Sequence, residues 1–193
     1  MAQATNQFLG EANLKFGIMC IIALIIVAAT SFCVSASDTT TNFHTGPFNV
    51  SVDLGESCND LEINEPVQGE WLDGTAYTDY IASACGAMLA FATTDKANHD
   101  LKDSFGTDTI FSDLVELGAD KDTIKVFERE IDGMPGAVGS GYVSKYGLNL
   151  YMASYYVSKD TIGHISVWGN ESKIKTALKT IHVTKGAYRI QLH

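Results

Sequence analysis

An uncharged stretch at residues 16–36 constrains this chain more than any other feature. It reads FGIMCIIALIIVAATSFCVSA, 21 residues without an acidic or basic side chain. A helix needs roughly 20 apolar residues to cross the hydrocarbon layer of a membrane, and the apolar part of a signal peptide is about 7–15 residues long. Length therefore favours a retained transmembrane helix. Val34-Ser35-Ala36 nevertheless forms an acceptable cleavage site before Ser37, so a cleaved signal segment stays open as the alternative.

The charges that flank this stretch predict its orientation. Lys15 and the amino terminus lie on one side, and Asp38, Asp53 and Glu56 follow on the other. Positive charge next to a membrane segment tends to stay in the cytoplasm, so the bulk of the chain is expected outside it. We accordingly expect either a single-pass protein of the cell membrane with an extracytoplasmic C-terminal domain, or a secreted protein.

The chain then divides into four parts. Residues 1–15 are a polar cytoplasmic tail, 16–36 the anchor or signal segment, 37–46 a tether rich in Ser and Thr, and 47–193 a folded domain. The last part is of ordinary domain size and large enough for a hydrophobic core.

Charge is distributed unevenly along the exported part. Residues 38–132 contain 20 acidic and 5 basic side chains, whereas residues 133–193 contain 2 acidic and 7 basic ones. The whole chain carries a formal net charge of −10. An acidic surface repels nucleic acid and anionic lipid, so neither is expected as a partner. A net charge far from zero keeps a protein soluble, and this is one explanation of the acidic surface. A basic partner or a cation-rich environment is the alternative.

Hydrophobic periodicity predicts an α+β domain, an antiparallel β-sheet with helices packed on it. Apolar and polar residues alternate at 48–54, which is typical of a half-buried strand. Two segments have helical spacing of apolar residues, one beginning at Asp108 and one capped by Asn170. Further strands are expected, joined by short turns that favour antiparallel pairing, at about 77–85, 87–94, 123–131, 137–144, 148–157, 161–168 and 182–185.

Residues 123–185 carry the one family resemblance in the chain. A strand is followed by the Gly-rich turn Asp132-Gly133-Met134-Pro135-Gly136, an aromatic strand at 148–157, a strand at 162–168 and a helix at 172–181. This order resembles the C-terminal half of PsbP-like domains, which are exported accessory proteins. The resemblance covers about a third of the chain and rests on pattern. It implies a noncatalytic role in assembly, and it assigns no functional residue.

Two cysteines, Cys58 and Cys85, lie in the predicted outer domain. Thiols outside the cytoplasm tend to oxidise in pairs, so we expect a disulfide between them. Their spacing has no third or fourth ligand in a recognisable zinc pattern.

The densest set of metal-ligand residues is the segment DKANHDLKD. On a helix, Asp95, His99 and Asp103 share one face, with Asp100 beside them, and oxygen-rich sites of this kind suit calcium. In a loop the same residues are solvated charges. A site for a divalent cation is therefore one hypothesis and a plain polar loop the other.

Two glycosylation sequons are present, at Asn49 and Asn170. His164 lies within a predicted strand, and a solvent-facing or hydrogen-bonded sheet histidine explains it better than a general base does. The Gly-rich stretch after Asp132 lacks dinucleotide spacing and joins two strands, so it predicts a hairpin and no cofactor site.

These observations favour a binding function over catalysis. We expect a membrane-anchored extracytoplasmic accessory domain of the cell envelope that is noncatalytic and acts on a protein partner. A secreted or anchored protein that binds a small ligand or cation is the alternative. An enzyme of unfamiliar type is the third.

Overall fold

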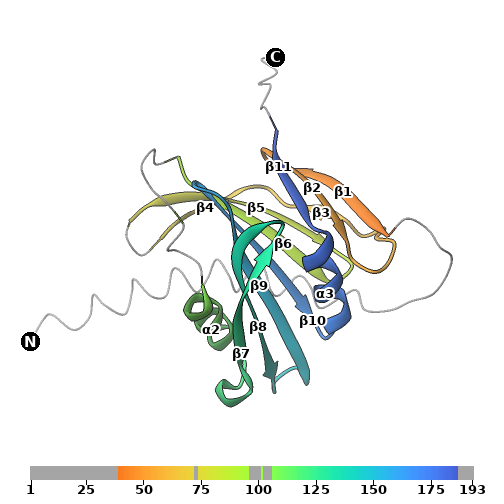
Figure 1. The fold of residues 1–193 in the computed structure, drawn as a ribbon, viewed down its shortest axis with the longest axis vertical. Coiled ribbons are helices and arrows are strands. Elements are labelled where there is room, and N and C mark those ends of the chain that lie inside the picture. Colours follow the sequence, from red (N-terminus) through yellow and green to blue (C-terminus); the bar gives the residue numbers. More distant parts are fainter. Residues whose placement is uncertain (1–38, 72–73, 96–100, 102–105, 187–193) are drawn as a thin grey trace, which may run out of the picture. The chain divides into compact units, whose positions relative to one another are not determined.

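The computed structural model describes residues 39–71, 74–95, 101 and 106–186 (Figure 1). Most of their secondary structure is β-sheet, arranged as one large and one small sheet. All strand pairs in both sheets are antiparallel. Short connections between consecutive strands, which the sequence has throughout, produce this arrangement.

The large sheet has the strand order β3-β5-β6-β10-β9-β8-β7, and β4 pairs with β5 beside β3. Pro66 separates β3 from β4, because proline cannot donate a hydrogen bond to the ladder. The strands are β3 (Glu62–Ile63), β4 (Val67–Glu70), β5 (Ala76–Ala84), β6 (Ala87–Thr93), β7 (Lys125–Ile131), β8 (Met134–Val143), β9 (Leu148–Ser158) and β10 (Thr161–Trp168).

The small sheet has the order β1-β2-β11. Its strands are β1 (Thr40–Thr45), β2 (Phe48–Asp53) and β11 (His182–Lys185). Burial alternates strictly along β1 and β2, so that Phe43, Phe48 and Val50 point into the core and the polar residues between them point away from it. This alternation gives the small sheet one face that packs on the core and one face that is exposed to solvent.

The two α-helices of the described residues pack on opposite faces of the large sheet. Helix α3 (Glu171–Thr180) buries Ile174, Ala177 and Leu178 in the same cluster as the small sheet. Helix α2 (Thr107–Glu116) buries Ile110 and Leu114 against β7, β8 and β9, and a 3-10 turn (Lys121–Thr123) leads from it into β7 (Figure 1).

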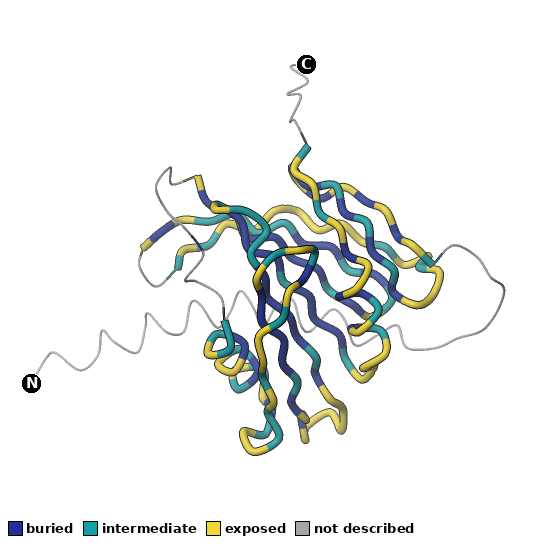
Figure 2. The backbone as a smooth tube through the Cα atoms, in the orientation of Figure 1, coloured by how far each residue is buried: buried dark blue, intermediate teal, exposed yellow. Residues whose placement is uncertain are grey.

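The main core lies between the large sheet, the small sheet and α3. Alternate residues of the central strands face it, among them Leu89, Phe91, Ala153 and Ile165. Buried positions accordingly alternate with partly exposed ones along the strands (Figure 2). The smaller cluster under α2 uses the other residues of the same strands, including Leu150 and Met152.

Small residues of β8 allow α2 to approach the sheet closely. A Cβ atom built at Gly139 lies 2.4 Å from Cγ2 of Ile110, and one built at Gly141 lies 2.7 Å from Cβ of Ala119. Any larger side chain at these positions has to displace the helix or the turn that follows it. The Gly-rich stretch expected to be a hairpin return is therefore mostly strand, and its glycines provide room for α2.

Two hairpins turn through residues with positive φ. Cys85 and Asp132 have φ of 51° and 52°, and each is followed by a glycine that also has positive φ. A residue-Gly pair of this kind matches the right-handed twist of the two strands that it joins. The turn expected at Asp132-Gly133 is confirmed.

The structure corrects several expectations. The α+β fold class is wrong, because strands take up more than half of the described residues and the α-helices only two short segments. Residues 40–45, expected to belong to a tether, form β1. Helix α2 begins after Gly106, with no side-chain cap, so Asp108 is not its N-cap.

The transmembrane helix expected at 16–36 falls on residues that the structure does not describe. No helix among the described residues is long and apolar enough to cross a membrane.

A candidate binding groove on the small sheet

The outer face of the small sheet is hollowed into a groove of about 200 Å³. Each of its three strands contributes two outward polar side chains. They are Asn42 and His44 from β1, Asn49 and Ser51 from β2, and His182 and Thr184 from β11.

Strand register arranges these side chains in two rows across the sheet. Asn42 lies opposite Ser51, which lies opposite His182. The second row joins His44, Asn49 and Thr184 in the same way. Neighbouring strands are about 4.8 Å apart and alternate residues of a strand about 7 Å apart, so the groove presents a regular grid of polar groups.

Most of this grid has unused hydrogen-bonding capacity. His182 uses Nδ1 in a contact of 2.9 Å with Oδ1 of Asp132 and keeps Nε2 for another partner. The other five lining side chains form no hydrogen bond with any residue in the described part of the chain. Hydroxyl, amide and imidazole groups that face solvent in this way can each bind a ligand.

The large sheet fixes the position of β11, and therefore the position of one wall of the groove. Asp132, in the turn between β7 and β8, accepts the backbone N–H of Val183 through Oδ2 at 2.9 Å. Asp160, in the turn between β9 and β10, accepts a hydrogen bond of 2.7 Å from Nζ of Lys185. Two hairpin turns of the large sheet thus hold β11 from its two ends.

The expected metal-ligand cluster is only partly within the described residues. Asp95 is exposed and follows β6. His99, Asp100 and Asp103 lie outside the described residues, so the divalent-cation site stays a prediction.

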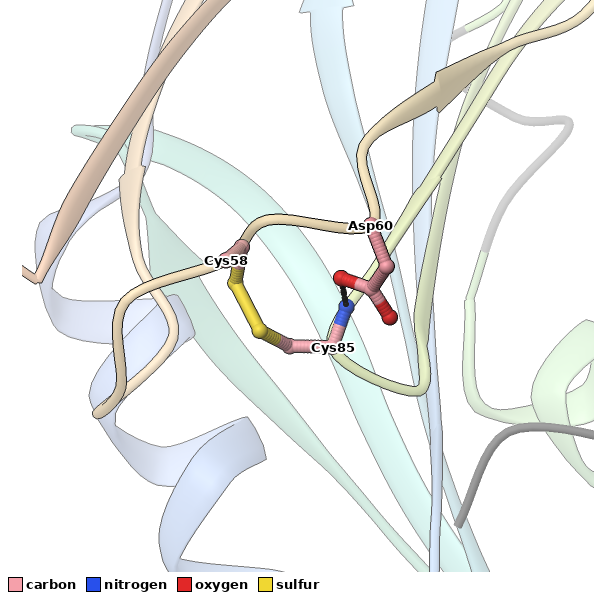
Figure 3. Close-up of side chains that lie close together, drawn as sticks. All are labelled: Cys58, Asp60 and Cys85. Carbon is pink, nitrogen blue, oxygen red and sulfur yellow. Dashed lines mark hydrogen bonds between the residues drawn. A yellow bond between two sulfur atoms is a disulfide. The ribbon is translucent and has the colours of Figure 1, made fainter. Parts of the chain in front are cut away.

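The expected disulfide between Cys58 and Cys85 is confirmed, with a Cα–Cα distance of 5.5 Å (Figure 3). It joins the loop after β2 to the turn between β5 and β6. Asp60 accepts the backbone N–H of Cys85 through Oδ1 at 2.8 Å. The two sulfur atoms and the Asp60 carboxylate lie within 4.8 Å of one another, but sulfurs bonded to each other are not thiolates and cannot bind a metal as thiolates do. This corner is a structural bridge, which Lys173 of α3 reinforces by contacting Glu56 and the carbonyl of Cys85.

The two sequon asparagines occupy different environments. Asn170 is exposed and caps α3, its Oδ1 accepting the Lys173 N–H at 3.0 Å, as the sequence predicts. Asn49 is half-buried in the middle strand of the groove. Glycosylation of either asparagine stays a prediction: a glycan on Asn49 would occupy the groove, whereas a glycan on Nδ2 of Asn170 would leave the Oδ1 cap in place.

The face of the large sheet that carries α2 also contains buried polar groups. Burial lowers the pKa of His164 to about 4, so its ring is neutral at neutral pH. Ser154 lies directly opposite His164, and its hydroxyl is buried without a hydrogen bond to any described residue. Burial likewise raises the pKa of the Asp79 carboxyl to about 6. Ser154 and His164 do not act as nucleophile and base here, because the serine has no exposed surface and no hydrogen bond joins the two side chains.

Comparison with known proteins adds no assignment: no family model, curated protein or solved structure matches this chain. The PsbP-like resemblance thus stays a prediction from pattern. Sequence reasoning missed the groove because it placed one of its three strands in a tether. The alternation of Thr41, Phe43 and Thr45 with Asn42 and His44 is the signal that could have revealed it.

Proposed function

We propose that this chain is an exported, noncatalytic binding domain of the cell envelope and that its ligand docks in the groove of the small sheet. The observation that carries the proposal is the grid of six outward polar side chains, five of them without a hydrogen-bond partner in the described part of the chain. The groove is shallow and open, which suits binding better than it suits chemistry that requires exclusion of water.

Two observations support a location outside the cytoplasm. The apolar stretch at 16–36 provides either an anchor or a cleaved signal. The Cys58–Cys85 disulfide is typical of oxidising compartments.

Binding to envelope material tests the proposal. Full-length protein, solubilised in detergent, is incubated with delipidated cell envelopes, and the bound fraction is measured over a concentration series. We expect saturable binding that the double variant Asn42→Ala/His44→Ala weakens at least tenfold, because each lost hydrogen bond contributes about 1 kcal/mol. This variant leaves the Asn49 sequon intact.

Asn64→Ala is the matched control, since Asn64 is an exposed asparagine that follows β3, away from both the groove and the β7–β9 end of the large sheet. Equal binding by wild type and by the double variant contradicts the proposal. Equal loss in the double variant and in Asn64→Ala contradicts it too, because the loss is then unrelated to the groove.

A second candidate is docking of a protein partner at the end of the large sheet formed by β7, β8 and β9. Seven large hydrophobic side chains of the described residues are exposed, and five come from α2, β7 and the β8–β9 hairpin. These five are Phe111, Phe127, Tyr142, Tyr146 and Leu148. Exposed apolar side chains at one end of a sheet are candidates for a protein interface.

Site-specific photocrosslinking in intact cells tests this second candidate. A photoreactive residue in place of Phe127, which is 55% exposed, is expected to yield one discrete protein adduct. The same residue in place of Val67, 41% exposed on β4, is the control and is expected to yield none. Identical adduct patterns at both positions contradict docking at this end.

A further inference from the structure

Among the residues that the structure describes, no Lys, Arg, Asp or Glu side chain lines the groove, and its two histidines are the only lining groups that can ionise. Two carboxylates lie nearby, and each already accepts hydrogen bonds. Asp132 accepts from Val183 and contacts His182, and Asp53 accepts the backbone N–H of Gly55 at 2.7 Å.

This composition disfavours charged ligands. A hard cation needs several carboxylate or carbonyl oxygens directed at one point, which the lining does not offer. An anion gains most from Arg or Lys, which the described part of the lining does not include, and it has to approach a chain with a net charge of −10. A neutral ligand avoids both costs.

The hydrogen-bonding groups of the lining match hydroxyl groups. Asn42 and Asn49 each offer a donor and an acceptor side by side, and Ser51 and Thr184 offer hydroxyls that do both. A sugar hydroxyl also donates and accepts, so every lining group can pair with one. A ligand with hydroxyls on both edges of a ring can use both rows of the grid at once.

The dimensions of the groove agree with this chemistry. A hollow of about 200 Å³ has room for one part of a longer chain molecule. Because the groove is open to solvent, the rest of a chain molecule can extend beyond it.

We infer that the groove binds a neutral polyhydroxylated chain, an oligosaccharide, whose rings lie across β1, β2 and β11. This inference rests on the proposed function and specifies its ligand class. The experiment therefore has to separate a wrong ligand class from a wrong site.

Calorimetric titration and NMR of the full-length protein, in a detergent without a sugar head group, provide the test. The probes are the neutral oligosaccharides cellohexaose and chitohexaose, the anionic oligomer hexagalacturonate, and the cationic peptide hexalysine. We expect a neutral oligosaccharide to bind at least tenfold more tightly than either charged probe and to shift the ring proton signals of His44 and His182, with His164 unaffected. Asn42→Ala/His44→Ala is expected to weaken this binding at least tenfold, and Asn64→Ala to leave it unchanged.

Each other outcome overturns a defined part of the account. Tighter groove binding by hexagalacturonate or hexalysine overturns the neutral ligand class and keeps the site. No binding by any probe, with groove-dependent binding to envelopes intact, also overturns the ligand class alone. Neutral binding that shifts neither histidine and survives Asn42→Ala/His44→Ala overturns the groove as the oligosaccharide site. Envelope binding that ignores the groove variants overturns the proposed function and the inference together.

Discussion

Asp79 should make the stability of this protein depend on pH in a specific direction. Its side chain lies half-buried on β5, and its Oδ1 has no hydrogen-bond partner among the described residues. Burial raises the pKa of this carboxyl from 3.8 to about 6. The folded state therefore holds the Asp79 proton more tightly than the unfolded chain does, and the stability contributed by protonated Asp79 is present below pH 3.8 and is lost as pH rises through 6.

The size of the effect follows from the shift. A change of about two pKa units corresponds to about 3 kcal/mol of difference between the protonated and ionised forms, and partial exposure reduces this to about 2 kcal/mol. Asp79→Asn removes the ionisable group and keeps the shape. The quantity to follow is the free energy of unfolding of the variant minus that of wild type. We expect this difference to be about 2 kcal/mol larger at pH 8 than at pH 3.5.

Urea unfolding of both proteins at half-unit intervals from pH 3.5 to 8 measures this directly. The difference in free energy of unfolding should rise mainly between pH 4 and 6.5. Two other groups change the stability over the same pH range. Burial lowers the pKa of His164, which makes stability rise with pH, and burial raises the pKa of Asp113 to about 6, which makes stability fall with pH. Only the difference between variant and wild type therefore isolates Asp79. A difference independent of pH refutes the reasoning.

Three further substitutions test other parts of the structure by urea unfolding. Tyr155→Phe should raise the free energy of unfolding by about 1 kcal/mol, because the Tyr155 hydroxyl is buried without a partner in the described residues, and a clear loss of stability contradicts this. Replacing Cys58 and Cys85 with alanine should lower the free energy of unfolding by about 3.5 kcal/mol, since the bridge closes a loop with a sequence separation of 27. A loss below about 1 kcal/mol argues against a bridge in the native protein. Asn170→Ala should lower the free energy of unfolding by about 1 kcal/mol, because the α3 cap is lost. Ser172→Ala also removes the sequon but should lower it much less. Equal losses of stability contradict the capping role.

The sequence predicted the last third of the domain well because its local signals agree with one another. Asp132-Gly133 adopts the positive φ angles that such a turn requires, and Asn170 caps α3 as its position before an amphipathic segment indicates. Consecutive strands with short turns leave antiparallel pairing as the simplest arrangement. Neighbouring residues decide all of these features.

The fold class and the groove were harder to predict because they depend on distant contacts. Residues 40–45 are polar enough to suggest a tether, and they become a strand because β2 pairs with them on one side and their buried residues face the core. The pairing of β11 with β2 joins residues more than 130 positions apart, and no local pattern specifies it. The groove exists only once these three strands are adjacent.

The burial of the aromatic residues of β9 also depends on distant contacts that the local sequence does not specify. The period of two places Tyr155 on one face and Tyr156 on the other, but it does not say which face is covered. The structure buries Tyr155 completely, between Gly136 and Gly163 of the neighbouring strands, and leaves Tyr156 partly exposed. Packing of the small sheet and α3 decides this, and that packing is not local.

Hydrogen–deuterium exchange of the full-length protein, with and without delipidated cell envelopes, tests the central claim most directly. If the ligand docks in the groove, peptides that cover 40–53 and 182–185 should exchange more slowly when envelope material is bound, and peptides that cover 125–131 should not change. Protection confined to 125–131 contradicts the groove and favours the apolar end of the large sheet. Unchanged exchange in all three segments contradicts binding through either surface.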